Sequence, residues 1–387
     1  MANFGEITTR AYPRVSIAGN PSDGFWGKCV SMAFSNYSAK CSISPSNTFT
    51  FKGKRGEKLD LGSFSHLLDV LDRYFPSQFL IPKEIEEHKL ILANVKTFFD
   101  FCKLNDIKYE PKSFFLSYSS NIPYSLGFSG STAISIAVLR NLRSFYKTEI
   151  FGDNLESMAL HAETHELGRI AGPQDPVSVN RKACVYMDFS KEAYKKTASG
   201  KNLSDLEKAV VHVDYSSSHN YLSNPNEKGA KHLLFSVHVA CPEIEFLDDR
   251  NLPFFIITGG KRSDSSIELS PNIHAYRTGN KRVIEAMGKI SALAPLARDA
   301  ILKHDMKSLG EIITENFELS VEYFDNEYLG TGNINLVREA IKEGAYAKFP
   351  GSGGAVFGLY PNEDILQKLK RKFEDKGYKI EKVYPIF

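Results

Sequence analysis

The sequence predicts an α+β protein with two domains. Its 387 residues are 42% hydrophobic and 24% charged, which is ordinary globular composition with ample length for two domains. In the second half, strand-like and helix-like stretches alternate without the long crossover series of a doubly wound sheet, so we expect a two-layer arrangement there. A polar stretch near residues 190–230 is the best boundary candidate, and it divides the chain into residues 1–228 and 229–387.

Composition also bears on partners and compartment. The net charge is +2 and no basic aromatic patch is present, so nucleic acid is not an expected partner. The five cysteines are scattered without a Cys-x-x-Cys pair, which is typical of reduced thiols in a cytosolic protein. An apolar signal core and an apolar run of transmembrane length are both missing, so we expect a cytoplasmic protein that does not bind membranes.

The first strand is expected at Arg14–Ile17, where apolar and polar residues alternate, and Gly19–Pro21 ends it sharply. This places Arg14 on the strand and Asp23 on the loop beyond it. Arg14 could stabilise developing negative charge, and Asp23 could accept hydrogen bonds from a polyol. A strand-end turn capped by Asp23 explains the same residues.

The next stretch predicts a hairpin, then helices, then a strand. Alternation over residues 30–52 favours the hairpin, and residues 63–105 carry helical core stripes interrupted by Pro76 and Pro82. Residues 109–118 indicate another strand.

A small-residue loop, Ile122–Ala133, runs directly into a predicted helix. Gly127 and Gly130 leave no Cβ in the way, and the first helical turn offers free N–H groups, so the loop suits phosphate. It also carries three hydroxyls that could touch phosphate oxygen or Mg²⁺, those of Ser129, Ser131 and Thr132. Plain helix capping is the alternative interpretation.

A helix is expected over Leu155–Gly168, and it carries two histidines four residues apart, His161 and His165. Such a pair can share a metal ion, but the metalloprotease pattern puts glutamate directly after the first histidine, and here Glu163 is two later. The sequence therefore favours surface or packing histidines over a zinc site. Asp175, at a chain reversal, is either a catalytic acid or a turn-capping residue.

The second half predicts a buried strand at Phe254–Thr258 and a polar loop at Lys261–Ser266. Further on we expect two helices in 281–320, a third in 333–343, a glycine-rich segment at 348–354 leading to an apolar stretch, a helix at 364–376 and a strand at 378–384.

Three of these stretches, Arg14–Asp23, Pro123–Ala133 and Lys348–Gly354, together resemble the GHMP kinases, the family of galactokinase, homoserine kinase and mevalonate kinase. The resemblance is closer still to the plant-type glucuronokinase branch, and it covers roughly residues 12–360. The segments that carry it are Asn20–Asp23, Asn121–Pro123, Gly127–Ser131, Gly172–Asp175, Tyr186–Phe189, Ser263–Ser265, Lys348 and Gly351–Ala355.

The resemblance implies a ribosomal S5 domain 2-like N-terminal domain and a ferredoxin-like C-terminal domain, with the active site between them. It implies that Asp175 is the catalytic aspartate, that Arg14 lies beside it, and that Ser131 or Thr132 binds Mg²⁺ with Glu163. The residues it assigns to ATP are Pro123, Gly127, Ser129, Gly130, Ser131, Thr132, Gly351, Ser352, Gly353 and Gly354. Those it assigns to the sugar are Asn20, Asp23, Gln174 and Arg181.

The chain also departs from the plant-type pattern. Tyr124 and Pro176 stand at the two positions where the plant-type pattern has arginine. Two cations that could face a sugar carboxylate are therefore missing. Lys28, Arg169, Arg181 and Arg262 are possible replacements. The expected function is an ATP- and Mg²⁺-dependent kinase, monomeric or homodimeric, for the anomeric hydroxyl of D-glucuronate. The alternatives are another acceptor (galacturonate, galactose, arabinose, heptose or another small alcohol) and a ligand-sensing protein on a kinase fold.

Overall fold

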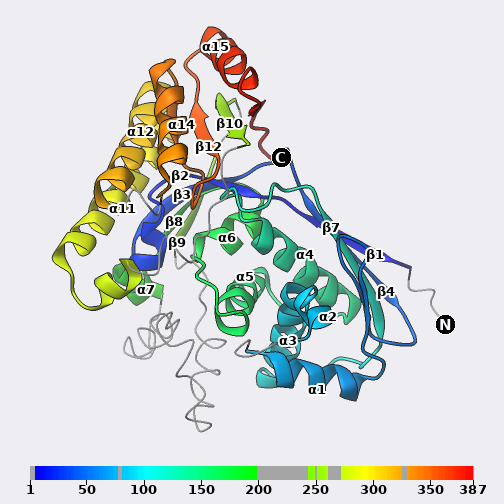
Figure 1. Ribbon diagram of the computed structural model, residues 1–387. Helices are drawn as coiled ribbons and strands as arrows, with labels where there is room; N and C mark the ends of the chain where they lie inside the picture. The colour runs from blue at the N-terminus through cyan, green and yellow to red at the C-terminus, as the bar shows by residue number, and fades with distance from the viewer. Residues whose placement is uncertain are drawn as a thin grey trace.

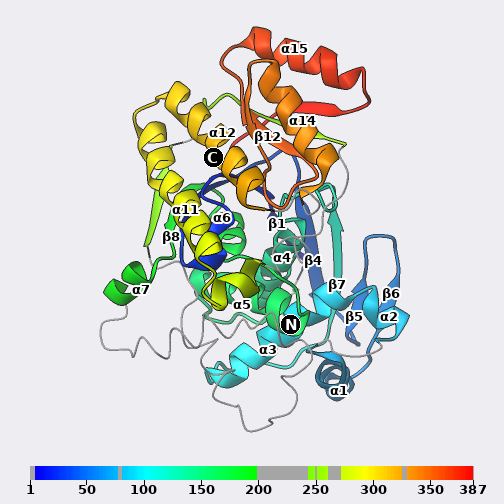
Figure 2. The same cartoon turned by 60° about the vertical axis from the view of Figure 1, so that its left-hand side comes forward.

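The structure is a computed structural model that describes residues 5–76, 81–197, 243–248, 251–259, 272–324 and 329–386. Its helices and strands form three β-sheets with helices packed beside and between them (Figures 1 and 2). The mixture confirms the predicted α+β class. None of the helices described combines the length and the apolar character needed to cross a membrane.

The first sheet has five strands in the order β1-β4-β7-β5-β6. Their bounds are β1 (Ile7–Ala11), β4 (Ala39–Pro45), β7 (Phe114–Ser120), β5 (Thr50–Lys52) and β6 (Lys58–Asp60). Along β4, buried residues alternate with more exposed ones, as expected for a strand covered on one face. Helix α4 (Gly130–Phe145) packs against β1 and β4, and α3 (Lys89–Leu104) packs on α4.

The second sheet has the order β2-β3-β8-β9 and lies deeper. Its strands are β2 (Arg14–Ala18), β3 (Lys28–Ala33), β8 (Cys184–Asp188) and β9 (Glu243–Leu247). Every residue of β2 and β8 is buried, which requires cover on both faces. Figure 1 shows α6 (Gln174–Arg181) and α11 (Lys281–Leu302) on opposite sides of this sheet, and both pack against β3.

The third sheet belongs to the C-terminal part and has the order β11-β12-β10-β13, with every neighbouring pair antiparallel. Its strands are β11 (Tyr346–Lys348), β12 (Val356–Leu359), β10 (Phe254–Thr258) and β13 (Lys379–Lys382). The helices beside it are α12 (Met306–Tyr323), α14 (Thr331–Lys342) and α15 (Glu363–Glu374).

The described chain also contains shorter elements. They are η1 (Ser22–Phe25), α1 (Phe64–Tyr74), α2 (Lys83–Glu86), α5 (Gly152–His161), the π-helical turn η2 (Ala162–Glu166) and α7 (Lys191–Thr197). Helix α5 and η2 together occupy the helix predicted at residues 155–168.

The hairpin predicted over residues 30–52 is wrong. Strand β3 pairs with β2 and β8, whereas β4 pairs with β1 and β7, so the two strands lie in different sheets. Alternation showed that both strands exist but carried no information about which partner each one takes.

The predicted boundary between residues 228 and 229 lies outside the described residues, as does the polar loop at Lys261–Ser266. Strand β9, which follows that boundary, pairs with β8, which precedes it. Helix α11 likewise packs on β2 and β3, and its Ala294 and Ala297 join the hydrophobic core of the first half. The division into 1–228 and 229–387 stays a prediction.

Candidate active site

A cavity of about 680 Å³ lies where the start of β2, the loop before α4, the η2–α6 segment and the loop after β11 meet. This volume lies within the range of small-molecule sites. Side chains of η1 and α12, including Asp23 and Phe317, line what we call the Asp23 end. Side chains of the five-stranded sheet and its loops, including Tyr118 and Tyr124, line what we call the Tyr124 end.

Two glycine-rich loops, residues 122–130 and 349–354, pack directly on each other beside this cavity. A Cβ on Gly351 would lie 2.5 Å from the carbonyl oxygen of Gly127, and one on Gly127 would lie 3.1 Å from that of Gly353. Gly127 also has a φ of 76°, which disfavours other residues. The close approach of the two backbones therefore requires glycine on both sides.

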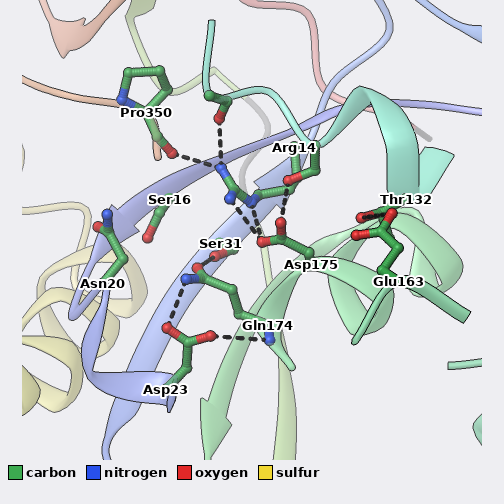
Figure 3. A network of polar contacts seen from close by, with 12 residues as sticks. Arg14, Ser16, Asn20, Asp23, Ser31, Thr132, Glu163, Gln174, Asp175 and Pro350 are labelled. Atoms are coloured by element: carbon green, nitrogen blue, oxygen red, sulfur yellow. Dashed lines mark hydrogen bonds and ion pairs between the residues drawn. The ribbon is translucent and has the colours of Figure 1, made fainter. Parts of the chain in front are cut away.

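The buried guanidinium of Arg14 joins both loops to Asp175 (Figure 3). Its Nε and Nη2 each lie 2.7 Å from Asp175 Oδ1. Its Nη1 donates to the carbonyl oxygens of Gly127 at 2.8 Å and Pro350 at 2.7 Å. One arginine at the start of β2 thus fixes an acid and two loops that are distant in the sequence.

The Asp175 carboxylate is held at both oxygens. It sits in the first turn of α6, where the helix dipole favours an acid, and Ser129 Oγ donates to its Oδ2 at 2.6 Å. Its side chain remains 18% exposed and lines the cavity. A carboxylate has about four lone-pair sites, so an anchored Asp175 can still accept a hydrogen bond from a ligand hydroxyl.

The N-terminus of α4 also faces the cavity. Ser129 precedes the helix in the left-handed conformation, with a φ of 56°, and Gly130 begins the helix. Ser129, Gly130 and Ser131 all line the cavity. The first N–H groups of a helix lack intrahelical partners and carry the positive end of the dipole, so this wall suits an anion.

Glu163 forms an oxygen-rich site beside this helix end. Thr132 Oγ1 donates to its Oε1 at 3.2 Å, and the Ser131 hydroxyl lies close to the same carboxylate. Burial raises the pKa of Glu163 above its ordinary value, and the positive charge of Arg169 opposes that shift. A carboxylate and two hydroxyls are all hard oxygen donors, the ligand type that Mg²⁺ prefers.

Hydrogen bonds fix the polar groups at the Asp23 end (Figure 3). Gln174 Nε2 donates to Asp23 Oδ1 at 2.8 Å, and the Gln174 backbone N–H donates to Asp23 Oδ2 at 3.3 Å. Ser31 Oγ in turn donates to Gln174 Oε1 at 2.7 Å. A Cβ on Gly172 would lie 2.1 Å from Asp23 Oδ2, so glycine is required there too.

Lys348 lies behind Asn20 in the same wall. Its buried Nζ donates to the carbonyl oxygen of Ser16 at 3.2 Å and to Asn20 Oδ1. Burial lowers the pKa of Lys348 well below its ordinary value, and the neighbouring charge of Arg14 adds to the shift. The lysine therefore orients Asn20.

Asp23 gives a testable dependence of stability on pH. Burial, reinforced by the charge of Asp175, raises the pKa of Asp23 from 3.8 to about 7. Between these two values the folded state binds more protons than the unfolded state, so this group lowers the free energy of unfolding as pH rises. Between pH 4 and pH 8 we expect wild type to lose up to about 4 kcal/mol more than Asp23→Asn. Urea denaturation at several pH values measures the difference, and parallel curves for the two proteins would contradict it.

All but four of the predicted site residues line the cavity. Thr132, Gly353 and Gly354 lie just behind the lining, where Thr132 contacts Glu163 and Gly353 contacts Gly127. Arg181 is not brought to the cavity, because its guanidinium pairs with Glu156 at 2.7 Å and also with Asp153. We therefore do not retain Arg181 as a ligand.

Neither Ser31 nor Gly172 was predicted to be a site residue. Ser31 lies 143 residues from its partner Gln174, and no local spacing connects them. Gly172 was visible as part of a turn, but its contact with Asp23 appears only when η1 and the η2–α6 segment lie side by side.

Comparisons with known proteins agree with this fold. Residues 91–186 match the family model described as the GHMP kinases N terminal domain, and residues 297–379 match the GHMP kinases C terminal model. Two Arabidopsis thaliana proteins are similar over most of their length. Probable glucuronokinase 2 is 31% identical over 98% of this chain and 91% of its own, and glucuronokinase 1 is 30% identical over 94% and 87%.

Solved structures share the fold at lower sequence identity. Lactococcus lactis galactokinase complexed with galactose superposes with a TM-score of 0.70 at 11% identity, covering 99% of this chain and 94% of that one. Methanococcus jannaschii mevalonate kinase gives a TM-score of 0.67 at 16% identity and covers 99% of both chains.

Proposed function

The chain belongs to the GHMP kinase family, and from this premise we propose that it is an ATP- and Mg²⁺-dependent sugar kinase. Its proposed acceptor is D-glucuronate, phosphorylated at the anomeric hydroxyl to give D-glucuronate 1-phosphate. The observation that carries this proposal is the anchored Asp175 carboxylate, which faces the cavity beside the anion-binding end of α4. From the cysteine usage we also infer a cytoplasmic location. We propose that the protein is a monomer or a homodimer.

The phosphates of ATP fit the first glycine loop and the N-terminus of α4. We assign them to backbone N–H groups near Gly127, Gly130 and Ser131, supported from behind by the second glycine loop. These donors are fixed before a ligand arrives, which suits phosphoryl transfer because that reaction depends on alignment and on stabilisation of charge. The Tyr124 end is then left for the nucleoside.

Mg²⁺ fits the oxygen donors of Glu163, Ser131 and Thr132. When bound, the ion supplies positive charge that offsets the charge of the phosphates. The contribution of the chain is to hold Glu163 in place through η2, beside the helix end that receives the phosphates.

Asp175 is proposed to orient the acceptor hydroxyl and to accept its hydrogen bond. Arg14 holds that carboxylate in place through two contacts to Oδ1. Asn20, Asp23 and Gln174 are proposed ligands of the sugar hydroxyls, since they line the Asp23 end. An anomeric hydroxyl is more acidic than a simple alcohol, so orientation contributes as much as proton acceptance.

The sugar carboxylate needs a cation, and Arg169 is the best placed of those that line the cavity. Arg14 and Lys348 are already engaged with protein acceptors, and Lys89 pairs with Glu86. Lys54 lies between β5 and β6 of the five-stranded sheet, and it therefore belongs to the Tyr124 end proposed for the nucleoside. Among the residues that the structure describes, Arg169 is the cavity-lining arginine that carries no ion pair within 4.0 Å. The Arg169 backbone N–H donates to the carbonyl oxygen of Glu163 at 2.9 Å, and three residues further on Gly172 contacts Asp23. The segment that carries Arg169 therefore runs from the proposed Mg²⁺ ligand toward the Asp23 end.

Replacement of Arg169 should separate acid sugars from neutral ones. For Arg169→Gln we expect kcat/KM for glucuronate to fall about 10–100-fold, because a charge-assisted pair with the carboxylate is lost. The KM for ATP and any turnover of glucose should change little. Arg73→Gln, on the exposed face of α1, is the matched control. Equal losses for acid and neutral sugars, or a raised KM for ATP, would assign Arg169 to the phosphates instead.

ADP release over a panel of sugars tests the function itself. Purified protein with ATP and Mg²⁺ should turn over glucuronate faster than galacturonate, glucose, galactose or arabinose. Turnover confined to a neutral sugar would keep the kinase and overturn the acceptor. ATP binding without turnover of any sugar would favour a ligand-sensing role.

A further inference from the structure

Three side chains at the end of α5 form a cluster separate from the proposed Mg²⁺ site. One ligand atom from each of His161, His165 and Glu166 lies within 4.8 Å of the other two. The two imidazole rings stack with centroids 4.6 Å apart and an interplanar angle of 26°. His161 Nε2 lies 3.3 Å from Glu166 Oε1. Two imidazoles and a carboxylate are the ligand types of many zinc sites.

The π-helical turn η2 explains why these three residues meet. In an ordinary α-helix, residue i+4 lies near residue i, but residue i+5 is about 140° further round the axis. A π-turn closes from i to i+5, so its wider circuit brings both i+4 and i+5 back beside i. His161, His165 and Glu166 have this spacing, and η2 spans Ala162–Glu166. Such turns occur frequently at functional sites.

The Glu166 carboxylate lacks the hydrogen bonds that a buried charge ordinarily receives. Its side chain is 0% exposed, and no donor within the described ranges makes a hydrogen bond to either oxygen. A buried carboxylate without donors is costly unless a cation compensates it. His161 is almost as buried, with 3% of its side chain exposed, and the Nε2 atom of the half-buried His165 is buried too.

The surrounding charge also favours a divalent cation. Lys96 is a neighbouring positive group among the described residues, and its charge interacts with Glu166. It also pairs with Asp72 at 3.0 Å and with Asp100 at 2.9 Å. One lysine and three carboxylates leave two negative charges in excess.

We propose that His161, His165 and Glu166 bind a divalent transition-metal ion of the Zn²⁺ type. The expected ligands are one nitrogen from each imidazole and one carboxylate oxygen, with water completing the coordination. The nitrogen ligands distinguish this site from the all-oxygen site at Glu163, which suits Mg²⁺. Because Glu163 lies on the same turn, an ion here stabilises the segment that carries the proposed Mg²⁺ ligand. The site stands on its own geometry and does not depend on the proposed acceptor.

The test measures Zn²⁺ binding to the full chain after treatment with a chelator, by competition with a chromophoric chelator. We expect one site per chain. Loss of even an outer-shell partner costs about 10–100-fold in metal affinity, so His165→Asn and Glu166→Gln should each weaken binding by more than about 100-fold. His66→Asn, at an exposed histidine of α1, is the matched control and should bind normally. Glu163→Gln should also keep Zn²⁺ binding.

Two further readouts separate a metal site from a structural histidine pair. Co²⁺ should give d–d absorption bands without the thiolate charge-transfer bands that a cysteine ligand would add. Zn²⁺ should raise the Tm of wild type but not that of His165→Asn, while the two proteins melt alike in chelator. Absence of binding, thiolate bands, or affinity unchanged in both His165→Asn and Glu166→Gln would overturn the site.

Discussion

Asp175→Asn is expected to fold normally and to lose about 10²–10⁴-fold in kcat. Asparagine keeps the size of the side chain and can still accept a hydrogen bond from Arg14. It removes the negative charge. Because asparagine has a single side-chain oxygen, it can accept from Arg14 or from Ser129 in the present geometry, but not from both. The acceptor hydroxyl then loses the carboxylate that orients it.

Steady-state kinetics with ATP and the preferred sugar measure this effect, and circular dichroism checks the fold. The KM for ATP should stay within about twofold, because the proposed phosphate site is formed by the glycine loops and the N-terminus of α4 and does not include Asp175. Turnover within tenfold of wild type would remove Asp175 from the catalytic role.

Arg14→Met should be more damaging, since it affects stability as well as turnover. The buried guanidinium contacts Asp175 and the carbonyl oxygens of Gly127 and Pro350. Breaking a buried ion pair by removing one partner costs about 3–5 kcal/mol, and because the Asp175 side chain is 18% exposed we expect a loss at the lower end of this range. We expect a loss of that size in urea denaturation and a fall in kcat at least as large as for Asp175→Asn.

Two companion variants sharpen the interpretation. Arg10→Met removes an exposed arginine from β1 and should leave both stability and turnover unchanged. In Arg14→Met combined with Asp175→Asn, the losses in stability should fall well short of the sum, because Arg14→Met removes entirely the contact that Asp175→Asn weakens. Additive losses would mean that Arg14 acts independently of Asp175.

Local pattern predicted the elements of this chain well. The strand at residues 254–258 agrees with β10 (Phe254–Thr258) to the residue, and the two helices expected in 281–320 are α11 and α12. These elements are decided by apolar periodicity over a few turns or pleats. The motif residues Arg14, Asp175 and Gly351 were grouped in advance through the family resemblance, and the cavity does bring them together.

The errors concern contacts between distant segments. The hairpin expected at residues 30–52 failed because β3 and β4 pair with strands elsewhere in the chain. Arg181 lies only six residues after Asp175, but it is the last residue of α6, whereas Asp175 is in the first turn. At that end of the helix the Arg181 guanidinium pairs with Glu156. Glu166 was not predicted to join the two histidines, because residues i and i+5 lie on different faces of an α-helix. Only the π-turn brings Glu166 beside His161.

The central claim, that this chain phosphorylates the anomeric hydroxyl of D-glucuronate, is tested most directly on the product. D-glucuronate labelled with ¹³C at C1 would be incubated with the protein, ATP and Mg²⁺, and the product examined by ³¹P and ¹³C NMR. The account predicts a ³¹P signal coupled to the labelled C1, in an amount equal to the ADP released, and far less product from Asp175→Asn. A phosphate on another carbon, or ADP release without a phosphorylated sugar, would contradict it.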